Sequence, residues 1–283
     1  MKGQIYKNLS GKYLVYADGK EYICTAKGGL KRTTDGILIG DYVEFNDNVI
    51  SAVFERKNRF IRPNVANVDA VAVLLSPTPK PDYLLLDKVI INARAQSTEI
   101  YIIINKIDVD NSIIEQIKKE YLDVVDGIIQ ISALNKTGID ELKQSLSGKL
   151  ICFCGQSAVG KTTLINAIFG HQLKTGELSK KTERGRHTTT FSQIYEEKQL
   201  KVVDTPGFAV IEAGVNSVDL KDYYPEFTDA SQNCRFRLCT HVNEPDCEVR
   251  RQVGDGVISQ GRYERYKEIY KQLIEKENIY GKN

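Results

Sequence analysis

The most constraining feature of the sequence is the run Gly-Gln-Ser-Ala-Val-Gly-Lys-Thr at residues 155–162. It follows an apolar run at 150–154 and opens a segment, 162–169, whose apolar residues recur at helical spacing. A glycine-rich turn between a strand and a helix presents backbone N–H groups to a phosphate, and the helix N-terminus adds positive potential. The alternative is a glycine turn with a purely structural role, but such a turn does not need a strand before it and a helix after it. The run therefore predicts a phosphate-binding loop.

Within this loop, we expect Lys161 to reach the β- and γ-phosphates of a nucleotide and the Thr162 hydroxyl to bind Mg²⁺. These two residues are also the first candidates for a catalytic role. The residues expected to line the nucleotide are Gly155, Gln156, Ser157, Ala158, Val159, Gly160, Lys161, Thr162 and Thr163.

The segments around the loop have the pattern of an α/β domain. Apolar runs at 70–75, 100–104, 128–131 and 150–153 alternate with helical patterns at 84–95, 113–122, 139–146 and 162–169. Continuous apolar strands between helices indicate a parallel sheet covered on both faces.

A second motif, Asn-Lys-Ile-Asp at residues 105–108, follows the predicted strand 100–104. It resembles the guanine-specificity motif of GTPases. The Asp108 carboxylate can accept both N1–H and N2–H₂ of guanine, which adenine does not offer, so a GTP site is expected to reject ATP. We expect Asn105, with Lys106 beside it, to meet the other base edge and tie loops together. Ser132 and Ala133, after the next strand, resemble the companion loop that contacts the base.

A third motif, Asp-Thr-Pro-Gly at residues 204–207, follows the strand 201–203. Asp204 is expected to hold Mg²⁺ through water, and the Gly207 N–H to meet the γ-phosphate. Alone, this pattern is a common turn. All three motifs, however, follow predicted parallel strands, and ligands in such folds bind at the carboxyl ends of the strands. An ATPase with an accidental Asn-Lys-Ile-Asp is the alternative, and nucleotide competition distinguishes the two.

The order of the motifs is unusual. In Ras-like GTPases the phosphate loop comes first, whereas here the motifs at 105 and 132 precede the loop at 155. Such a rearrangement leaves a site intact when surface loops and termini are rejoined. We therefore expect a circularly permuted P-loop GTPase domain over residues 63–215.

Residues 1–62 look all-β. Short runs at 13–16, 22–25, 37–45 and 49–54 are separated by turn signals, including the hairpin pair Asp18-Gly19. Strands this short and closely spaced favour a small barrel, and the OB-fold is a common nucleic-acid platform. The segment holds eleven Lys/Arg against seven Asp/Glu, which is compatible with a polyanion partner or with an ordinary solvated surface. Residues 56–67 are expected to be a linker.

The six cysteines fall into two groups. Cys24, Cys152 and Cys154 lie in apolar runs and are expected in the core. A metal site is predicted at Cys-x₄-Cys-x-His-x₅-Cys, whose spacing suits a closed, structural, tetrahedral Zn²⁺ site. Its ligands would be Cys234, Cys239, His241 and Cys247. A helix is expected to begin near Ser259, and residues 216–283 to form a small, α-rich zinc-binding domain.

These motifs together resemble a known family, the small ribosomal subunit biogenesis GTPases called RsgA, of the YjeQ/YloQ type. The resemblance covers essentially the whole chain. It implies a multidomain protein with an OB-fold barrel, a permuted GTPase domain and a zinc domain. It also implies a role in late maturation of the small ribosomal subunit, binding to its rRNA, and slow GTP hydrolysis that the subunit stimulates. Ribosome assembly factors are further partners to consider.

The segment Gly-Arg-His-Thr-Thr-Thr at residues 185–190 matches the family's first-switch pattern. One of Thr188 and Thr189 is expected to bind Mg²⁺ when GTP is present. His187 is a candidate for orienting the attacking water, with an RNA contact or a loop cap as the alternative. Phe208 stands where Ras-like GTPases have a water-orienting Gln, which predicts slow intrinsic hydrolysis.

The chain of 283 residues has no apolar run long enough to span a bilayer and no apolar segment at its start. We therefore expect a cytoplasmic protein that does not bind membranes. A monomer is the default expectation, because the sequence gives no sign of oligomerisation. The leading hypothesis is a GTP-hydrolysing switch on the small ribosomal subunit. The competing hypothesis is a GTP-gated RNA-binding scaffold in which hydrolysis is incidental.

Overall fold

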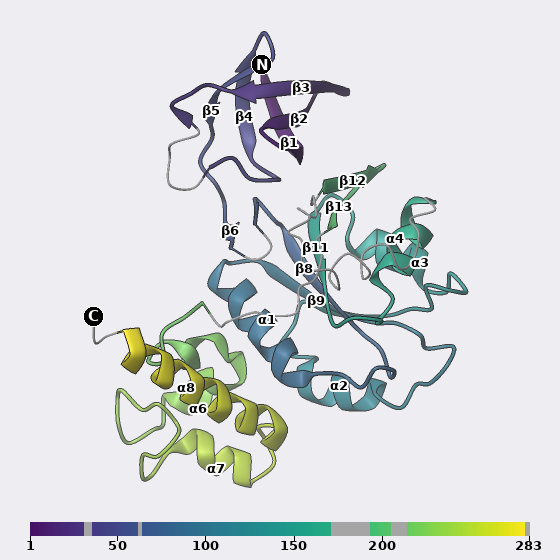
Figure 1. Ribbon diagram of the computed structural model, residues 1–283. Coiled ribbons are helices and arrows are strands. Elements are labelled where there is room, and N and C mark those ends of the chain that lie inside the picture. The colour runs from purple at the N-terminus through teal and green to yellow at the C-terminus, as the bar shows by residue number, and fades with distance from the viewer. Residues whose placement is uncertain (31–35, 62–63, 171–192, 205–213, 281–283) are drawn as a thin grey trace.

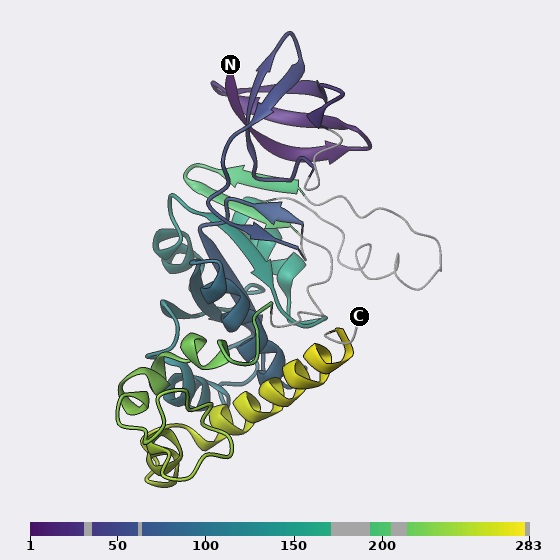
Figure 2. The same cartoon turned by 90° about the vertical axis from the view of Figure 1, so that its left-hand side faces the viewer.

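The computed structural model has a barrel at one end, a helix-covered sheet in the middle and a small helical region at the other end (Figures 1 and 2). The structure describes residues 1–30, 36–61, 64–170, 193–204 and 214–280. For Asp204 and Tyr280 it describes the backbone alone. None of the described helices combines the length and the apolar character needed to cross a membrane.

The N-terminal barrel is closed by hydrogen bonds in the order β1-β2-β3-β5-β4-β1. Its strands are β1 (Lys2–Leu9), β2 (Lys12–Ala17), β3 (Lys20–Ala26), β4 (Tyr42–Asn46) and β5 (Val49–Val53). The pairs are antiparallel except β3–β5. Alternate side chains point inward, so Ile5, Val15, Cys24 and Val43 are fully buried. The predicted hairpin is confirmed, since Asp18 and Gly19 both take positive φ between β2 and β3.

Three features of this region differ from the prediction. Strand β1 was missed because its sequence lacks a clean apolar alternation. The strand expected over 37–45 begins only at Tyr42, because the chain turns at Gly40, which has a φ of +88°. The buried Asp41 carboxylate holds this turn: it accepts a hydrogen bond from the Leu38 N–H (2.7 Å) and forms an ion pair with Arg56 (2.7 Å). The expected linker contains a two-stranded ribbon, β6 (Arg59–Phe60) with β7 (Val65–Ala66).

The central sheet has the strand order β10-β9-β8-β11-β13-β12. Its strands are β8 (Ala70–Leu75), β9 (Glu99–Ile104), β10 (Gly127–Gln130), β11 (Leu150–Cys154), β12 (Gln193–Glu197) and β13 (Leu200–Asp204). All pair in parallel except β12, which is antiparallel to β13. The buried side chains form two clusters, one on each face, as predicted for a parallel sheet between helices. Cys152 and Cys154 lie in these clusters as expected.

The helices that cover the sheet are α1 (Tyr83–Ala95), α2 (Ile114–Tyr121), α3 (Ile139–Ser145) and α4 (Lys161–Phe169). The chain moves outward from β8 through β9 to β10, returns to the centre at β11, and then adds β12 and β13 on the other side of the sheet. The direction therefore reverses between β8 and β11, and ligands of open α/β sheets bind at such a switch point.

The barrel and the central sheet share hydrogen bonds. Lys7 of β1 pairs with Gln193 of β12, so the eleven strands form one continuous sheet. The Tyr6 hydroxyl donates to Glu196 of β12, and Lys201 of β13 donates to Gln4 of β1 (3.3 Å). The barrel is thus attached to β12, the outer strand of the central sheet, and to its neighbour β13.

The C-terminal region contains two short 3₁₀ turns, η2 (Leu220–Tyr223) and η3 (Pro225–Phe227), and three helices, α6 (Thr228–Ser231), α7 (Glu248–Gly254) and α8 (Gln260–Tyr280). Helix α8 begins where predicted, and the Ser259 hydroxyl accepts from the Arg262 N–H (3.3 Å). The side chains of Tyr263, Tyr266 and Ile269 are buried along one stripe of α8. This core includes Ile91 of α1, so the region packs against the central domain (Figure 1).

Candidate nucleotide and metal sites

The loop after β11 comes so close to its neighbours that two positions exclude a side chain. Gly155 has φ +137°, and a Cβ there would lie 2.4 Å from the Leu74 carbonyl oxygen. Gly160 has φ +101°, and a Cβ there would lie 2.3 Å from Asn105 Nδ2. These glycines let the backbone fold back on itself, as a phosphate-binding loop requires.

Lys161 begins α4 and bends back over the loop. Its ammonium donates to the carbonyl oxygens of Gly155 (2.6 Å) and Gln156 (2.9 Å). Thr162 and Thr163 follow in the first turn of α4 and are half-buried. The N-terminus of α4 and this ammonium therefore place positive potential at the same loop.

Asn105, directly after β9, joins two of the predicted loops. Its amide donates to the Val159 carbonyl (2.9 Å), and its carbonyl oxygen accepts from the Ala133 N–H (3.0 Å). Asn105 is only 2% exposed, so both bonds lie away from water. The amide keeps one N–H available for the predicted contact with a base.

Lys106 also connects neighbouring loops at the carboxyl ends of the parallel strands. It takes a left-handed φ of +65°, and its ammonium donates to the carbonyls of Thr78 (2.6 Å) and Ala158 (2.8 Å). The Asp108 carboxylate lies exposed at the end of this loop and has no hydrogen-bond or ion-pair partner within the described residues. It is therefore available to accept from a ligand.

The companion loop after β10 is held by Ser132. Its backbone exchanges two hydrogen bonds with Thr137, both of 3.1 Å, and its hydroxyl accepts from the Asn135 N–H (3.1 Å). Ala133 is fixed through Asn105, and the next side chain, Leu134, is 76% exposed. An apolar side chain on a fixed loop next to Asp108's loop can cover the face of a base.

Sequence reasoning missed a contact between the phosphate loop and α1. The Gln156 side chain accepts from the N–H of Asp82 (3.0 Å), and Asp82 caps α1 by accepting from the Leu85 N–H (2.9 Å). These residues are 74 positions apart in the sequence, and no local pattern signals their contact.

The other residues predicted to bind the nucleotide lie at or beyond the limits of the described residues. The backbone of Asp204 ends β13, beside β11 and on the same edge as the phosphate loop. Its side chain, together with His187, Thr188, Thr189 and Gly207, lies outside the described residues.

In the C-terminal region, Cys234, Cys239, His241 and Cys247 converge. Their ligand atoms all lie within 4.8 Å of one another. His241 Nδ1 is 3.6 Å from Cys234 Sγ and 3.5 Å from Cys247 Sγ, and the two sulfurs are 3.9 Å apart. Zinc–ligand bonds of about 2.0–2.3 Å at tetrahedral angles separate such atoms by about 3.5–3.8 Å, so the cluster fits this metal.

The other ring nitrogen of His241 is also positioned. Nε2 lies 3.1 Å from the Ser231 hydroxyl, which donates to the Phe227 carbonyl (2.6 Å). Since that hydroxyl proton is already used, Nε2 carries the proton and donates, which leaves the Nδ1 lone pair facing the sulfurs.

Burial shapes the electrostatics of the cluster. It lowers the pKa of His241 to about 4, with Lys221 contributing, so the ring is neutral and able to bind a metal. Burial also raises the pKa of the Cys239 thiol. A Cys239 thiolate is therefore unfavourable without a cation, and a divalent metal would supply that positive charge.

Comparisons with known proteins agree with this geometry. The sequence profile described as RsgA GTPase matches residues 53–214, and the one described as RsgA N-terminal domain matches residues 2–50. A protein of Caldanaerobacter subterraneus subsp. tengcongensis named small ribosomal subunit biogenesis GTPase RsgA is 36% identical, over 100% of this chain and 99% of that protein. A Geobacillus protein of the same name is 35% identical, over 99% of both chains.

Two solved structures share the fold. The crystal structure of YjeQ from Thermotoga maritima superposes with a TM-score of 0.81 at 32% identity, over 96% of this chain and 98% of that one. The structure of YloQ, described as a circularly permuted GTPase, gives a TM-score of 0.77 at 28% identity, over 97% and 95%. The permuted order of loops around one sheet edge therefore has a known counterpart, and the chain belongs to the RsgA GTPase family.

Proposed function

We propose that this protein is a GTP-dependent switch in late maturation of the small ribosomal subunit. The observation that carries the proposal is the convergence of the loops after β9, β10 and β11, which Asn105 binds together at one sheet edge. The curated relatives named small ribosomal subunit biogenesis GTPase RsgA supply the biological context. GTP would favour the subunit-bound state, and hydrolysis triggered by the subunit would favour release.

At the nucleotide site, Lys161 would bind the β- and γ-phosphates, and Thr162 would hold Mg²⁺, which screens the phosphate charge. Asp108 would select guanine through its unpaired carboxylate, and Ala133 would contact the base from the companion loop. The proposed roles of Gly207 and of Thr188 or Thr189, which would bind the γ-phosphate and Mg²⁺, rest on the sequence pattern alone.

His187 is the proposed water-orienting residue. The variant H187A should slow hydrolysis while leaving GTP affinity near normal, because the phosphate loop and guanine motif stay intact. An unchanged rate would reject this role.

In the C-terminal region, we propose one structural Zn²⁺ held by the Cys₃His cluster. Four protein ligands would leave no open position for a substrate, and the three thiols and the neutral imidazole suit that ion. The metal would contribute folding energy to a region whose loops carry little regular structure.

The proposed partners are the small ribosomal subunit and its rRNA, with ribosome assembly factors as further candidates and the cytoplasm as the compartment. The protein would act there as a monomer. The barrel offers a surface suited to RNA, where the Lys2 ammonium lies 5.1 Å from the ring centroid of Tyr42 and 4.8 Å from that of Phe54. Basic groups beside exposed rings are typical of nucleic-acid platforms.

A variant that binds GTP without hydrolysing it tests the switch. Such a variant should accumulate on small subunits and stall their maturation, since release depends on hydrolysis. If it instead supports normal maturation, the protein is a GTP-gated scaffold and the switch proposal is wrong.

A further inference from the structure

The segment Arg-Phe-Arg-Leu at residues 235–238 forms a short turn between two residues of the Cys₃His cluster, Cys234 and Cys239. The Cys239 N–H donates to the Phe236 carbonyl (3.1 Å), which closes the turn. The carbonyl of Cys239 accepts from the Lys221 ammonium (3.0 Å), so the turn is also tied to η2. At the other end, the Cys234 N–H donates to the Ser231 carbonyl (3.2 Å), so both ends of the turn are held.

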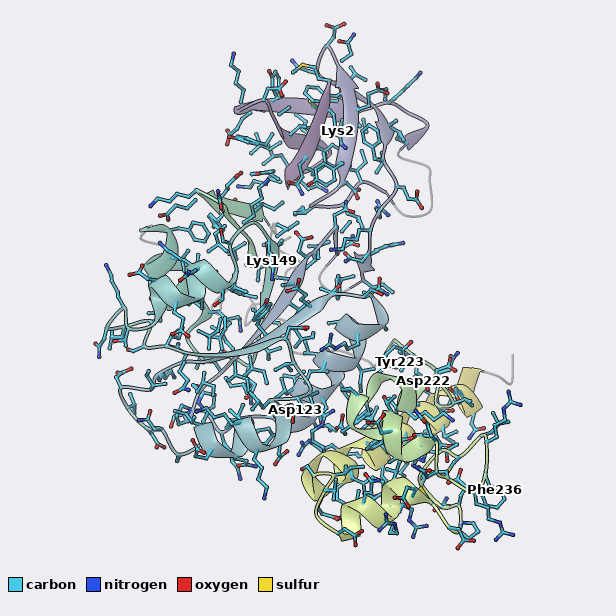
Figure 3. The ribbon with its side chains drawn as sticks, turned by 180° about the vertical axis from the view of Figure 1, so that it is seen from behind. Lys2, Asp123, Lys149, Asp222, Tyr223 and Phe236 are labelled. Carbon is cyan, nitrogen blue, oxygen red and sulfur yellow. The ribbon has the colours of Figure 1, made fainter. Side chains whose placement is uncertain are left out.

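Two of the four side chains of this turn are apolar and exposed. Phe236 is 43% exposed, the highest value among the described Phe and Tyr side chains, and Leu238 is 78% exposed. Figure 3 shows Phe236 at the outer edge of the C-terminal region, away from the central sheet. Single exposed apolar residues are common, and here two of them stand on one anchored turn beside two arginines.

The arginines around the turn differ in whether they have an ion-pair partner. Arg235 lies 5.5 Å from the centroid of the Phe236 ring and pairs with Asp246 (2.8 Å). Arg251, on α7, is held by Glu248 (2.6 Å) and by Asp255. Arg237, in contrast, has no hydrogen-bond or ion-pair partner within the described residues. The turn therefore combines an exposed ring, braced by one arginine, with a second arginine whose charge is uncompensated.

We propose that the turn 235–238 is a stacking platform for an unpaired base of single-stranded RNA, with Arg237 binding an adjacent phosphate. An aromatic ring offers a π-face to any base, and an arginine beside it neutralises the backbone. An acidic peptide would use the arginine but would gain little from the ring. This inference rests on the proposed function, which brings the protein to rRNA, and it names the chemistry of one contact.

The chain contains no tryptophan, which permits a direct test. The variant F236W places a single indole at the turn, where stacking on a base should quench its fluorescence. Unlabelled single-stranded oligo(A) RNA of twelve nucleotides is the probe, and double-stranded RNA of the same length is the comparison. The matched control is L122W, at a position 61% exposed after α2 in the central domain, which should not be quenched.

Binding to purified small subunits gives the second readout. F236A should weaken binding about five- to a hundredfold, whereas F236Y should bind nearly as the unsubstituted protein does, because it keeps a ring. R237A should reduce the slope of log affinity against log salt by about 0.7, as expected for one lost phosphate contact on a single strand. Variants are compared at equal zinc content, so that a misfolded turn is recognised.

Quenching of F236W by single-stranded RNA, together with the loss in F236A, is the expected result. If the unsubstituted protein binds small subunits and F236A binds them equally well, the stacking platform is wrong and the proposed function stands. Quenching by subunit proteins but not by RNA would assign the turn to a protein partner and overturn the inference. If the unsubstituted protein does not bind small subunits, the proposed function fails, and the oligonucleotide titration alone decides the stacking.

Discussion

Arg262 of α8 and Asp87 of α1 form a buried ion pair, with the guanidinium nitrogen 2.6 Å from the carboxylate oxygen. The two residues are 1% and 0% exposed. The second Asp87 oxygen binds Arg265, one helical turn away from the pair (2.5 Å). Burial opposes the charge on Arg262, but Asp87 and Glu226 raise its pKa well above the ordinary value, so it stays charged. This network connects the C-terminal region to α1, whose N-cap residue, Asp82, contacts the phosphate loop.

Removing one partner of this pair should destabilise the protein strongly. R262L leaves the buried Asp87 carboxylate with Arg265 alone and removes the cation from the half-buried Glu226, which should lower the free energy of unfolding by about 3–5 kcal/mol. The control K271A removes an exposed pair with Glu275 on the same helix and should change it by less than about 0.5 kcal/mol. Urea unfolding at equal zinc content measures both. Equal stability of the two variants would contradict the role assigned to the network.

The central domain could be predicted from the sequence largely because its patterns are local. The helix expected over 84–95 is α1 (Tyr83–Ala95), and the apolar run at 150–154 is β11. In contrast, β1 depends on partners in β2, β4 and β12, and its own sequence does not show them. The Asp87–Arg262 pair was also missed, because no local pattern connects two residues separated by 175 positions in the sequence.

At the sites, sequence spacing predicted candidate residues but not their supporting contacts. The four residues of the Cys₃His motif lie together, and the motif loops after β9, β10 and β11 share one edge of the sheet. The groups that hold these residues in place come from elsewhere in the chain: the Thr78 carbonyl accepts from Lys106, and the Ser231 hydroxyl contacts His241. These are backbone carbonyls and a common hydroxyl, which no residue-type pattern distinguishes.

The phosphate loop predicts a position-specific effect of glycine substitution. G160A would push a methyl group into the Asn105 amide, which is held by two hydrogen bonds, so GTP affinity should fall about tenfold or more. The control G148A has a similar positive φ, +78°, with no atom near its Cβ, so it should cost about 1–2 kcal/mol of stability and leave GTP affinity unchanged. Calorimetric titration with GTP compares them; equal affinities would show that the loop tolerates the methyl group.

Guanine selection by Asp108 predicts a change of base preference. In D108N, the side-chain amide can no longer accept both guanine donors, so GTP affinity should fall about tenfold or more. Xanthine carries a carbonyl in place of the amino group, so xanthosine triphosphate should bind better to D108N than to the unsubstituted protein. D110N, two residues on and hydrogen-bonded to Ser112, is the control that should behave normally. Unaltered GTP selectivity in D108N would exclude Asp108 from base recognition.

The contact between Ser231 and His241 predicts a measurable effect on metal retention. S231A removes the oxygen that orients Nε2, which should weaken zinc affinity about 10- to 100-fold, as loss of a supporting hydrogen bond does at other metal sites. D229A, on the same short helix and exposed, should retain zinc normally. Competition with a chromogenic chelator measures the affinities. Purified protein that lacks zinc but keeps a folded C-terminal region would reject the structural metal site itself.

The most direct test of the central claim is hydrolysis of GTP and ATP by the purified protein, with and without isolated small ribosomal subunits. A subunit-triggered GTPase should hydrolyse GTP slowly alone, accelerate sharply when small subunits are added, and leave ATP untouched. GTP turnover that is indifferent to small subunits, or ATP turnover that matches it, would contradict the account.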